Sequence, residues 1–544
     1  MSATFADKIQ MQNLLFAELS KMFGREVPLY DKSLIVNKAC NQTVGALLAR
    51  KYTGFQLSEA ELDKASGERH GAIRIGKSEE YRWIAAFFAA FGLEPHNFYD
   101  MTNLGGKSQP VIATAFRSRL NPEHRVFTSL LMTDYFDPQT RGRIETLLAP
   151  REVFTARSKE LVQKSERDGG LSWDDARALI GEGTKSIFKW TGRARDHRLY
   201  RELSSMGFKI AADIACFEAH HLNHLTPNTF CMDLYTAAMK FCLGELSADV
   251  FSKRAQRVLE FLCAFSDRDY LRLHFRHLSR SAIDGYAMEI VSGNEIAELA
   301  TGLTNRLRQP EFALQELNHA GFKDFTEGPS ADTPVLLRQD SYKALTESVT
   351  FREDDGTSVE TKHTARFGEI EQRCYATTPK GRALYDECLA NADKVREADP
   401  GFIKRDHDGY QHAYAICFAA FPKKLLGLLE QGLVYGIYSA TAKGLAAGYQ
   451  RQIQTRDANE LVRLGYAQVE GLRYEDFLPF SAAGIFASNL GQYGTKSTAA
   501  AKSVYSQATL EQIMGRKIID PNLTYASLQE ESLSKLYSDL GISR

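Results

Sequence analysis

The sequence lacks the patterns that mark several common classes of protein. It has eight cysteines but no CxxC pair, so neither a zinc ribbon nor a disulfide framework is indicated. No run of about 18 apolar residues occurs, which excludes a membrane-spanning helix. The first residues, MSATFADKIQ, lack the apolar segment of a signal peptide. We therefore expect reduced cysteines and a cytoplasmic protein with no membrane partner.

Neither sign of charge is in excess. The 67 Lys and Arg residues nearly balance the 68 Asp and Glu residues, which gives a net charge of −1. Because surfaces that bind nucleic acid are usually basic, we expect no nucleic-acid partner. Hydrophobic residues make up 44% of the 544 positions, which is enough for a large buried core. Nothing in the sequence indicates an oligomeric state.

Segments typical of strands and of helices are mixed along the chain. Strand patterns occupy residues 110–117, 124–132, 209–217, 333–341 and 361–378, and most of 150–205 is helical. We find no short internal repeat and no low-complexity segment. This mixture predicts an α+β fold in which residues 1–544 form a single catalytic body.

Two segments differ in composition from the rest. Residues 235–310 are rich in Leu, Ala, Arg and Glu, with helical spacing and no strand pattern. We interpret them as a helical insertion within the body, with an interface or a lid as possible roles. Residues 501–544 have the pattern of a helical C-terminal tail.

The segment ERHGAIRIG, residues 68–76, places His70 four residues before Arg74. On a helix, this i,i+4 spacing would put both side chains on one face. On a strand, positions 70, 72 and 74 also point the same way. The strand reading would place a potential metal ligand and a fixed cation in one cavity.

Two further segments concentrate residues that bind metals. HHLNHLTPN carries three histidines, at positions 220, 221 and 224, and neither close spacing is the HExxH of a zinc hydrolase. FGEIEQR carries Glu369 and Glu371, which share a face if the segment is a strand. The simpler alternatives are surface imidazoles that cap a loop and a solvated edge strand balanced by nearby arginines.

Together these segments suggest one metal site. One histidine from each of two strands and one carboxylate from a third would form a 2-His-1-carboxylate facial triad, which is typical of non-haem Fe(II). The triad leaves three open coordination positions, enough for a 2-oxo acid and O₂. Arg74 would then bind a substrate carboxylate, because a guanidinium group matches a carboxylate with two parallel hydrogen bonds.

Several blocks resemble a known family. ERHGAIRIG, HLNHLTP, LLRQDSYKALTE, HTARFGEIEQR with TPKGRALYD, and YEDFLPFSAAGIFASNL are similar, in this order, to segments of the 2-oxoadipate dioxygenase/decarboxylase (hydroxyglutarate synthase) family. The resemblance implies a vicinal-oxygen-chelate-like curved β-sheet around an Fe(II) site, surrounded by helices. It also implies conversion of 2-oxoadipate and O₂ to 2-hydroxyglutarate and CO₂, a late step of lysine breakdown.

The resemblance also implies roles for individual residues. His70, His224 and Glu369 would bind the metal, and Arg74 would be the catalytic partner of the substrate carboxylate. Glu369 is preferred because FGEIEQR is also similar to the ligand segment of 4-hydroxyphenylpyruvate dioxygenase; Glu371 is the reserve candidate, as His221 is for His224. The substrate would contact His70, Arg74, His224, Phe480 and Ser481.

The chain departs from the family pattern at three positions. Asn228 replaces an arginine after LTP, Cys374 replaces a glycine after EQR, and Phe480 replaces a valine before SAAGIF. These changes affect the expected substrate more than the metal site, since a bulkier Phe480 would shorten the pocket. Alternatives are therefore another 2-oxo acid, a non-oxidative metal-dependent lyase or hydrolase on the same scaffold, and a non-catalytic protein that binds partners through the insertion.

Overall fold

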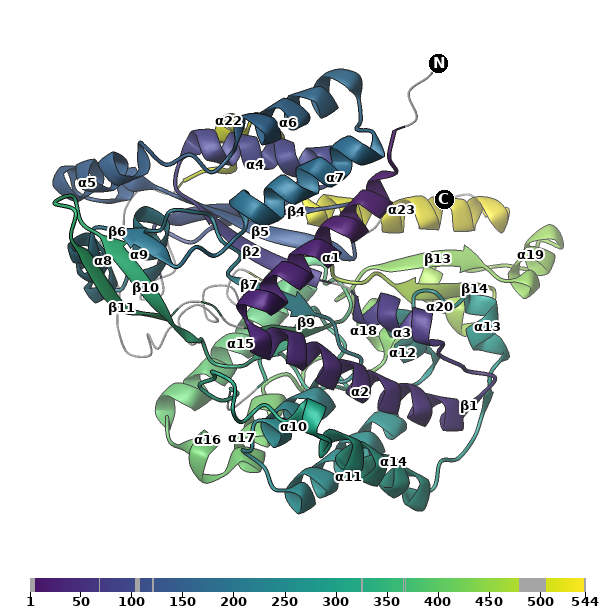
Figure 1. The fold of residues 1–544 in the computed structure, drawn as a ribbon. Helices are drawn as coiled ribbons and strands as arrows, with labels where there is room; N and C mark the ends of the chain where they lie inside the picture. The colour runs from purple at the N-terminus through teal and green to yellow at the C-terminus, as the bar shows by residue number, and fades with distance from the viewer. Residues whose placement is uncertain are drawn as a thin grey trace.

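The structure is a computed structural model. It describes residues 5–67, 69–102, 108–119, 122–323, 326–364, 366, 368–478 and 505–542. Helices surround a central group of strands (Figure 1), so the α+β prediction is confirmed. None of the described helices is both long enough and apolar enough to cross a membrane.

The largest sheet has five strands, in the order β3-β4-β5-β2-β7. Their bounds are β3 Glu94–Asp100, β4 Val111–Arg117, β5 His124–Leu131, β2 Arg69–Ile75 and β7 His224–Pro227. β2 is parallel to β5, and the other neighbouring pairs are antiparallel. The strands predicted at 110–117 and 124–132 are β4 and β5, and the strand reading of the His70 segment is confirmed by β2.

A two-stranded sheet continues from β7. It contains β9 (Leu337–Ser341) and β12 (Glu369–Arg373), which are antiparallel. An isolated bridge joins Asn228, just after β7, to Glu371 on β12, and the amide of Thr229 donates to the Glu371 carbonyl at 2.9 Å. The segment 361–378, predicted as one strand, contains the end of β11 (Ser358–Thr364) and the separate strand β12.

Three smaller sheets lie outside this centre. β10 (Thr346–Arg352) pairs with β11 and with β6 (Arg193–Arg195). β13 (Gly436–Ala440) pairs with β14 (Ala467–Gly471), and the two-residue strands β1 (Tyr52–Thr53) and β8 (Ala287–Met288) pair with each other.

The first half of the chain supplies helices around the five-stranded sheet. They are α1 Lys8–Glu26, α2 Pro28–Lys51, α3 Glu59–Ser66, α4 Ser78–Ala90, α5 Pro138–Leu148, α6 Ala156–Asp168, α7 Trp173–Glu182, α8 His197–Ser205 and α9 Lys209–Cys216. α4 packs on the sheet, and the Tyr81 hydroxyl donates to the carbonyl of Thr128 on β5 at 2.8 Å. Figure 1 shows α6 and α22 beyond α4.

The segment predicted as a buried strand at 209–217 is the helix α9, so this prediction is wrong. Residues 210–216 are all buried, and a short segment that is apolar on every side has no periodicity to separate helix from strand. Alanine, which occurs three times in KIAADIAC, favours the helix.

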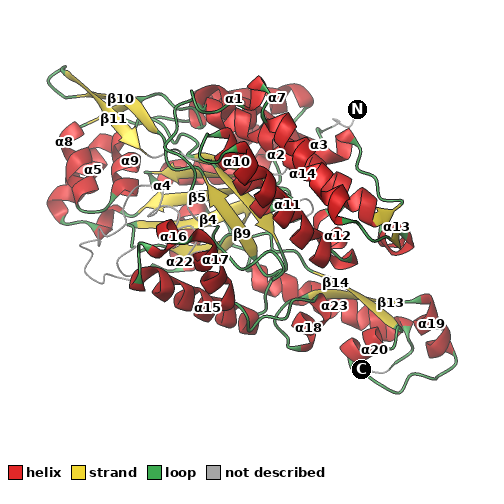
Figure 2. Ribbon diagram, turned by 90° about the horizontal axis from the view of Figure 1, so that it is seen from below, coloured by secondary structure: helices red, strands yellow, loops and turns green. Residues whose placement is uncertain are grey.

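The regular elements of residues 232–312 are helices apart from β8. They form α10 Met232–Cys242, α11 Ala248–Phe265, α12 Arg268–His274, α13 Arg280–Gly285 and α14 Gly293–Leu307. α10, α11 and α14 pack against the long helix α2, and Figure 2 shows this group on one side of the strands. The role of this segment as an insertion stays a prediction.

The last part of the chain forms a second apolar core around β13 and β14. Its helices are α15 Pro379–Ala398, α16 Phe402–Arg405, α17 His407–Ile416, α18 Leu425–Glu430, α19 Ala442–Tyr449, α20 Ala458–Arg463 and α23 Pro521–Asp539. The remaining helix of this part of the chain, α22 Gln507–Met514, packs on α4 instead. α23 packs along β13, where Gln529 and Ser532 accept hydrogen bonds from backbone amides. The predicted tail therefore contains two helices among its described residues.

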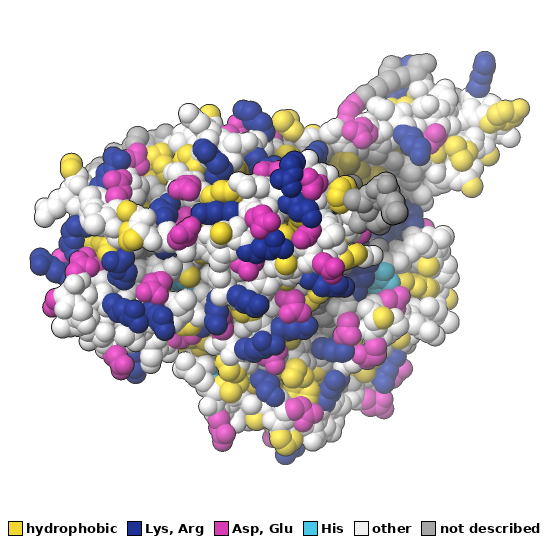
Figure 3. Space-filling model, turned by 45° about the horizontal axis from the view of Figure 1, so that its top comes forward, with side chains coloured by type: hydrophobic (Ala, Val, Ile, Leu, Met, Phe, Trp, Pro, Cys, Tyr) yellow, Lys and Arg dark blue, Asp and Glu magenta, His cyan; other side chains and the backbone are white. Residues whose placement is uncertain are grey.

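Side chains of both charges are mixed on the visible face of the molecule in Figure 3. No large area of one sign interrupts this mixture on that face, in keeping with the balanced composition.

Candidate metal centre

Three potential metal ligands meet on neighbouring strands. Nε2 of His70 (β2) lies 3.3 Å from Oε2 of Glu369 (β12), and Nε2 of His224 (β7) lies 3.4 Å from the same oxygen. One ligand atom from each residue lies within 4.8 Å of the other two, and all three side chains are buried. Among the described residues this is the one group of three or more His, Cys, Asp or Glu side chains that meets this spacing.

Strand register explains how these residues meet. His224 pairs with Ala72 on β2, so its side chain lies on the same face of the sheet as His70 and Arg74. β12 follows Gly368 closely, where a Cβ atom would overlap the ring of Tyr342. Glycine at position 368 therefore allows the start of the strand that carries Glu369 to lie close to the ring of Tyr342.

The charges of His224 and Glu369 suit a cation. Burial lowers the pKa of His224 to about 4, so its imidazole is neutral at neutral pH. Burial raises the pKa of Glu369, but the two nearby histidines outweigh it and hold the pKa below its usual value. Two nitrogen donors and one anionic oxygen are the ligand set that non-haem Fe(II) prefers, so the donor set fits the predicted metal.

Glu371, the reserve ligand, lies on the far side of the His70 ring. Its Oε2 is 2.9 Å from Nδ1 of His70, and its two oxygens also accept from Arg373 at 2.8 and 2.9 Å and from Arg125 at 3.2 Å. Burial raises the pKa of Glu371, but Arg373, His70 and Arg125 together hold it well below its usual range. Glu371 is thus an anion that contacts a ligand and is outside the group of three.

The other two histidines of HHLNHLTPN face different partners. Nε2 of His221 lies 3.5 Å from Oδ1 of Asp213 on α9, and Nε2 of His220 lies 3.1 Å from Oε2 of Glu80 on α4. Neither belongs to the group formed by His70, His224 and Glu369. Of the three histidines, His224 is the one that shares this group.

Arg74 is buried on the same sheet face as His70, four residues further along β2. Its Nη1 donates to Oδ2 of Asp213. The sequence reasoning missed Asp213, because the segment was expected to be a strand. The three alanines of KIAADIAC, which favour a helix, were the signal that could have placed it.

An aromatic wall also lies beside His70. The ring of Phe477 is 5.0 Å from the His70 ring and 5.4 Å from the ring of Phe127, measured between centroids. The Phe477 amide donates to the Tyr99 hydroxyl at 3.1 Å. Phe477 was not predicted, although it precedes LPFSAAGIF directly. Phe480 and Ser481 lie outside the described residues.

The other two departures from the family pattern can be located. Asn228 is buried; its carbonyl accepts from Asn37 at 2.9 Å and its Oδ1 from Arg473 at 3.4 Å. Cys374 is buried in the second apolar core, where burial raises the pKa of its thiol to about 12. Since Cys374 follows Arg373 on the chain, its side chain points away from the Glu371 face of β12.

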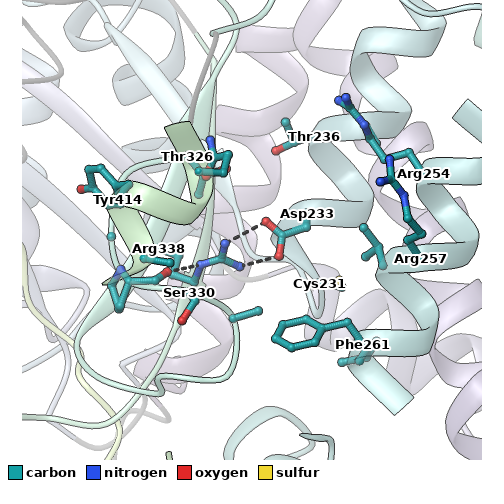
Figure 4. Close-up of a pocket in the computed structure, with 18 of the residues that line it drawn as sticks. Cys231, Asp233, Thr236, Arg254, Arg257, Phe261, Thr326, Ser330, Arg338 and Tyr414 are labelled. Atoms are coloured by element: carbon teal, nitrogen blue, oxygen red, sulfur yellow. Dashed lines mark hydrogen bonds and ion pairs between the residues drawn. The ribbon is translucent and has the colours of Figure 1, made fainter. Parts of the chain in front are cut away.

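A separate cleft of about 450 Å³ lies beyond the opposite face of β9 and β12. Arg338 and Asp233 form an ion pair of 2.8 and 3.1 Å in its wall, and Thr236 and Thr326 lie nearby (Figure 4). The cleft contains none of the three potential ligands.

Comparison with known proteins identifies the family. The profile of the family described as 2-oxoadipate dioxygenase/decarboxylase matches residues 15–247 and 270–489. The 2-oxoadipate dioxygenase/decarboxylase of Pseudomonas putida is 34% identical over 537 residues, which cover 95% of this chain and 94% of that protein. The protein of the same name from Escherichia coli is 31% identical over 544 residues, which cover 97% of each chain.

A solved structure of a related protein also matches this chain. The crystal structure of the hydroxyglutarate synthase from Pseudomonas putida in complex with 2-oxoadipate matches with a TM-score of 0.67 and 31% identity. The match covers 99% of this chain and 100% of that one. The chain therefore belongs to the 2-oxoadipate dioxygenase/decarboxylase family.

Proposed function

We propose that this protein is an Fe(II)-dependent dioxygenase and decarboxylase that converts 2-oxoadipate and O₂ to 2-hydroxyglutarate and CO₂. The observation that carries the proposal is the group formed by His70, His224 and Glu369, buried on three neighbouring strands of a chain from this family. The name of the Pseudomonas putida relative, and the 2-oxoadipate in the related crystal structure, support the choice of substrate.

The three residues would hold iron through two imidazole nitrogens and one carboxylate oxygen. Bound iron would supply the oxygen chemistry, since a 2-His-1-carboxylate site leaves positions open. The protein orients the ligands: Thr226 donates to Oε2 of Glu369 at 3.1 Å, and Glu371 holds the opposite nitrogen of His70. Burial keeps this part of the molecule dry, which strengthens charge interactions with a substrate.

Arg74 would bind the distal carboxylate of the substrate. Four residues along a strand separate its Cα from that of His70 by about 13 Å. Two side chains and a small diacid can fill this span. Because Asp213 accepts from Nη1, the guanidinium group is held in one orientation.

We also propose that the five-stranded sheet and the β9–β12 pair together form the curved, vicinal-oxygen-chelate-like sheet of the family. The bridge between Asn228 and Glu371 joins the two sheets at the metal ligands, which supports this interpretation. Phe480 and Ser481 remain our candidates for the far end of the substrate pocket. We further propose that the protein acts in lysine breakdown and is located in the cytoplasm.

Oxygen consumption tests the reaction. The protein is purified without metal, loaded with Fe(II) under argon, and mixed with 2-oxoadipate in an oxygen electrode. We expect O₂ uptake with equal amounts of CO₂ and 2-hydroxyglutarate. Product formation without O₂ uptake, or with Zn(II) in place of Fe(II), would instead indicate a non-oxidative lyase or hydrolase on the same scaffold.

A further inference from the structure

A buried polar cluster lies behind Arg74. Asp213 is at its centre: Oδ2 accepts from Nη1 of Arg74, and Oδ1 lies 3.5 Å from Nε2 of both His221 and His363. All four side chains are buried. They come from β2, α9, the segment before β7, and β11, and the proposed reaction gives no role to the two histidines.

Aromatic rings enclose this cluster. The ring of Trp190 meets His221 edge-on at 4.7 Å and stacks on His363 at 5.8 Å, and Phe217 lies 4.6 Å from His363. The hydroxyl of Tyr200 lies 2.7 Å from Nδ1 of His363. In such surroundings, an unbalanced charge is costly, so the net charge of the cluster is constrained.

Without a ligand, the charges of the cluster balance. Arg74 and Asp213 cancel each other, and burial lowers the pKa of His221 to about 3 and that of His363 to about 4, so both are neutral. Other titratable or charged groups act on the cluster from the packed elements: Tyr200 on α8, Lys209 and Cys216 on α9, and Arg366 after β11.

These other groups do not upset the balance. Burial raises the pKa values of Tyr200 and Cys216, which are therefore neutral. Arg366 is engaged by two carboxylates, those of Glu26 and Glu347, each at 2.6 Å. Lys209 acts on the pKa of His363 less strongly than Asp213, Arg74 and Arg366 do.

We propose that this cluster compensates the charge of the substrate: when the distal carboxylate of a 2-oxo diacid pairs with Arg74, Asp213 and its two histidines take up one proton from solvent. The inference rests on the proposed function and deepens it, since it explains how a buried site accepts a second negative charge. Asp213, His221 and His363 are thus positioning residues, and the proton resides on one of the two imidazoles beside Asp213.

The direction of proton movement follows from the geometry. In the free protein, the positive charge of Arg74 helps to keep both imidazoles neutral. When a substrate carboxylate pairs with Arg74, that charge is cancelled and Asp213 becomes an excess anion. Both Nε2 atoms already face that anion. A proton on either imidazole restores neutrality, and a 2-oxo acid without a distal carboxylate requires none.

Calorimetry measures the proton directly. The metal-loaded protein is titrated under argon, so that no turnover occurs, with 2-oxoadipate and with 2-oxohexanoate, which has the same length but no second carboxylate. Each titration is made in buffers of different ionisation enthalpy. We expect uptake of up to one proton more with 2-oxoadipate, and an affinity that weakens up to tenfold per pH unit between pH 6.5 and 8. Equal proton numbers for the two ligands would overturn the proposal.

Variants locate the proton. Asp213→Asn removes the negative charge, so the extra uptake should disappear, and the His221→Gln/His363→Gln double variant should abolish it while leaving Arg74 and Asp213 together. Asp233→Asn, which breaks an Arg–Asp pair in the separate cleft (Figure 4), is the matched control and should retain full uptake. Extra uptake that persists in the double variant would contradict the proposal.

The two levels of proposal can fail separately. If the wild-type protein consumes no O₂ with 2-oxoadipate and binds neither acid, the proposed function is wrong. If it consumes O₂ with 2-oxoadipate but takes up no additional proton on binding it, only the charge-compensation proposal is wrong. The comparison of two ligands uses wild-type protein, so it does not depend on whether a variant folds.

Discussion

Oε2 of Glu371 lies 2.9 Å from Nδ1 of His70, while Nε2 of the same ring faces Glu369 at 3.3 Å. A carboxylate this close to one ring nitrogen favours a proton on that nitrogen and leaves the lone pair of the other nitrogen for a metal. Arg125 and Arg373 keep Glu371 ionised and stationary. The glutamate two residues after Glu369 thus prepares His70 for a metal.

Replacing Glu371 should therefore weaken metal binding without removing a ligand. We expect Glu371→Gln to lower the affinity for Fe(II) about 10–100-fold, measured anaerobically by competition with a chelator. His221→Gln should keep the wild-type affinity, because His221 faces Asp213. Equal losses in both variants would show that the effect comes from general disturbance of the buried site.

Removing a ligand should abolish the stabilisation that the metal gives. A metal that binds only the folded state raises the melting temperature, by an amount that grows with concentration. We expect this rise in the wild-type protein and none in His224→Ala or Glu369→Ala, as followed by circular dichroism. His220→Gln, whose partner is Glu80, serves as the control and should still respond to metal.

Arg74→Lys should separate binding of the metal from recognition of the substrate. An ammonium group cannot form the two parallel hydrogen bonds of a guanidinium group, so the variant should bind Fe(II) normally and lose most activity toward 2-oxoadipate. Activity toward 2-oxohexanoate should change little. Unaltered kinetics with 2-oxoadipate would mean that Arg74 serves only to pair with Asp213.

Asp340 predicts a pH dependence of stability. It is buried on β9, where its Oδ2 accepts from Thr236 at 3.0 Å and from Thr326 at 3.1 Å, and burial raises its pKa to about 7. The unfolded chain ionises this group near pH 4 and the folded protein near pH 7. Its contribution to stability is therefore complete below pH 4 and is lost as the pH rises to 7. At about 1.4 kcal/mol per pKa unit, this loss amounts to a few kcal/mol of unfolding free energy.

Asp340→Asn should remove this dependence. Relative to the wild-type protein, the variant should gain free energy of unfolding as the pH rises from 4 to 7, measured by urea denaturation at several pH values. A constant difference between the two proteins over this range would contradict the assignment. Asp233→Asn is the control, because it removes a carboxylate from the nearby cleft and keeps Asp340.

Tyr525 connects the C-terminal helix to the centre of the molecule. Its hydroxyl donates to Oδ2 of Asp476 at 2.7 Å and accepts from the amide of Glu475 at 2.9 Å, and Asp476 also pairs with Arg117 on β4. Tyr525→Phe leaves both buried groups without this partner, so we expect a loss of about 1–3 kcal/mol of unfolding free energy. Tyr537→Phe, on the exposed end of α23, should cost less.

The three potential ligands could be selected from the sequence, whereas many of the residues that contact their surroundings could not. His70, His224 and Glu369 stand in short segments whose residue types and strand parity are visible locally. Asp213, Tyr200 and Phe477 act through contacts between segments far apart in the chain, which no local pattern specifies. The error at 209–217 has the same origin, since burial on every side removes the periodicity on which the prediction depends.

His70 and Glu369 are 299 positions apart in the chain, with His224 between them. During synthesis, β2 and β7 leave the ribosome long before β12 exists. A chain interrupted before residue 369 would contain both histidines and no carboxylate ligand, so a complete metal site has to wait for the last of the three strands. The proposed iron would therefore be bound late in synthesis, and early fragments of this protein would be poor competitors for cellular iron.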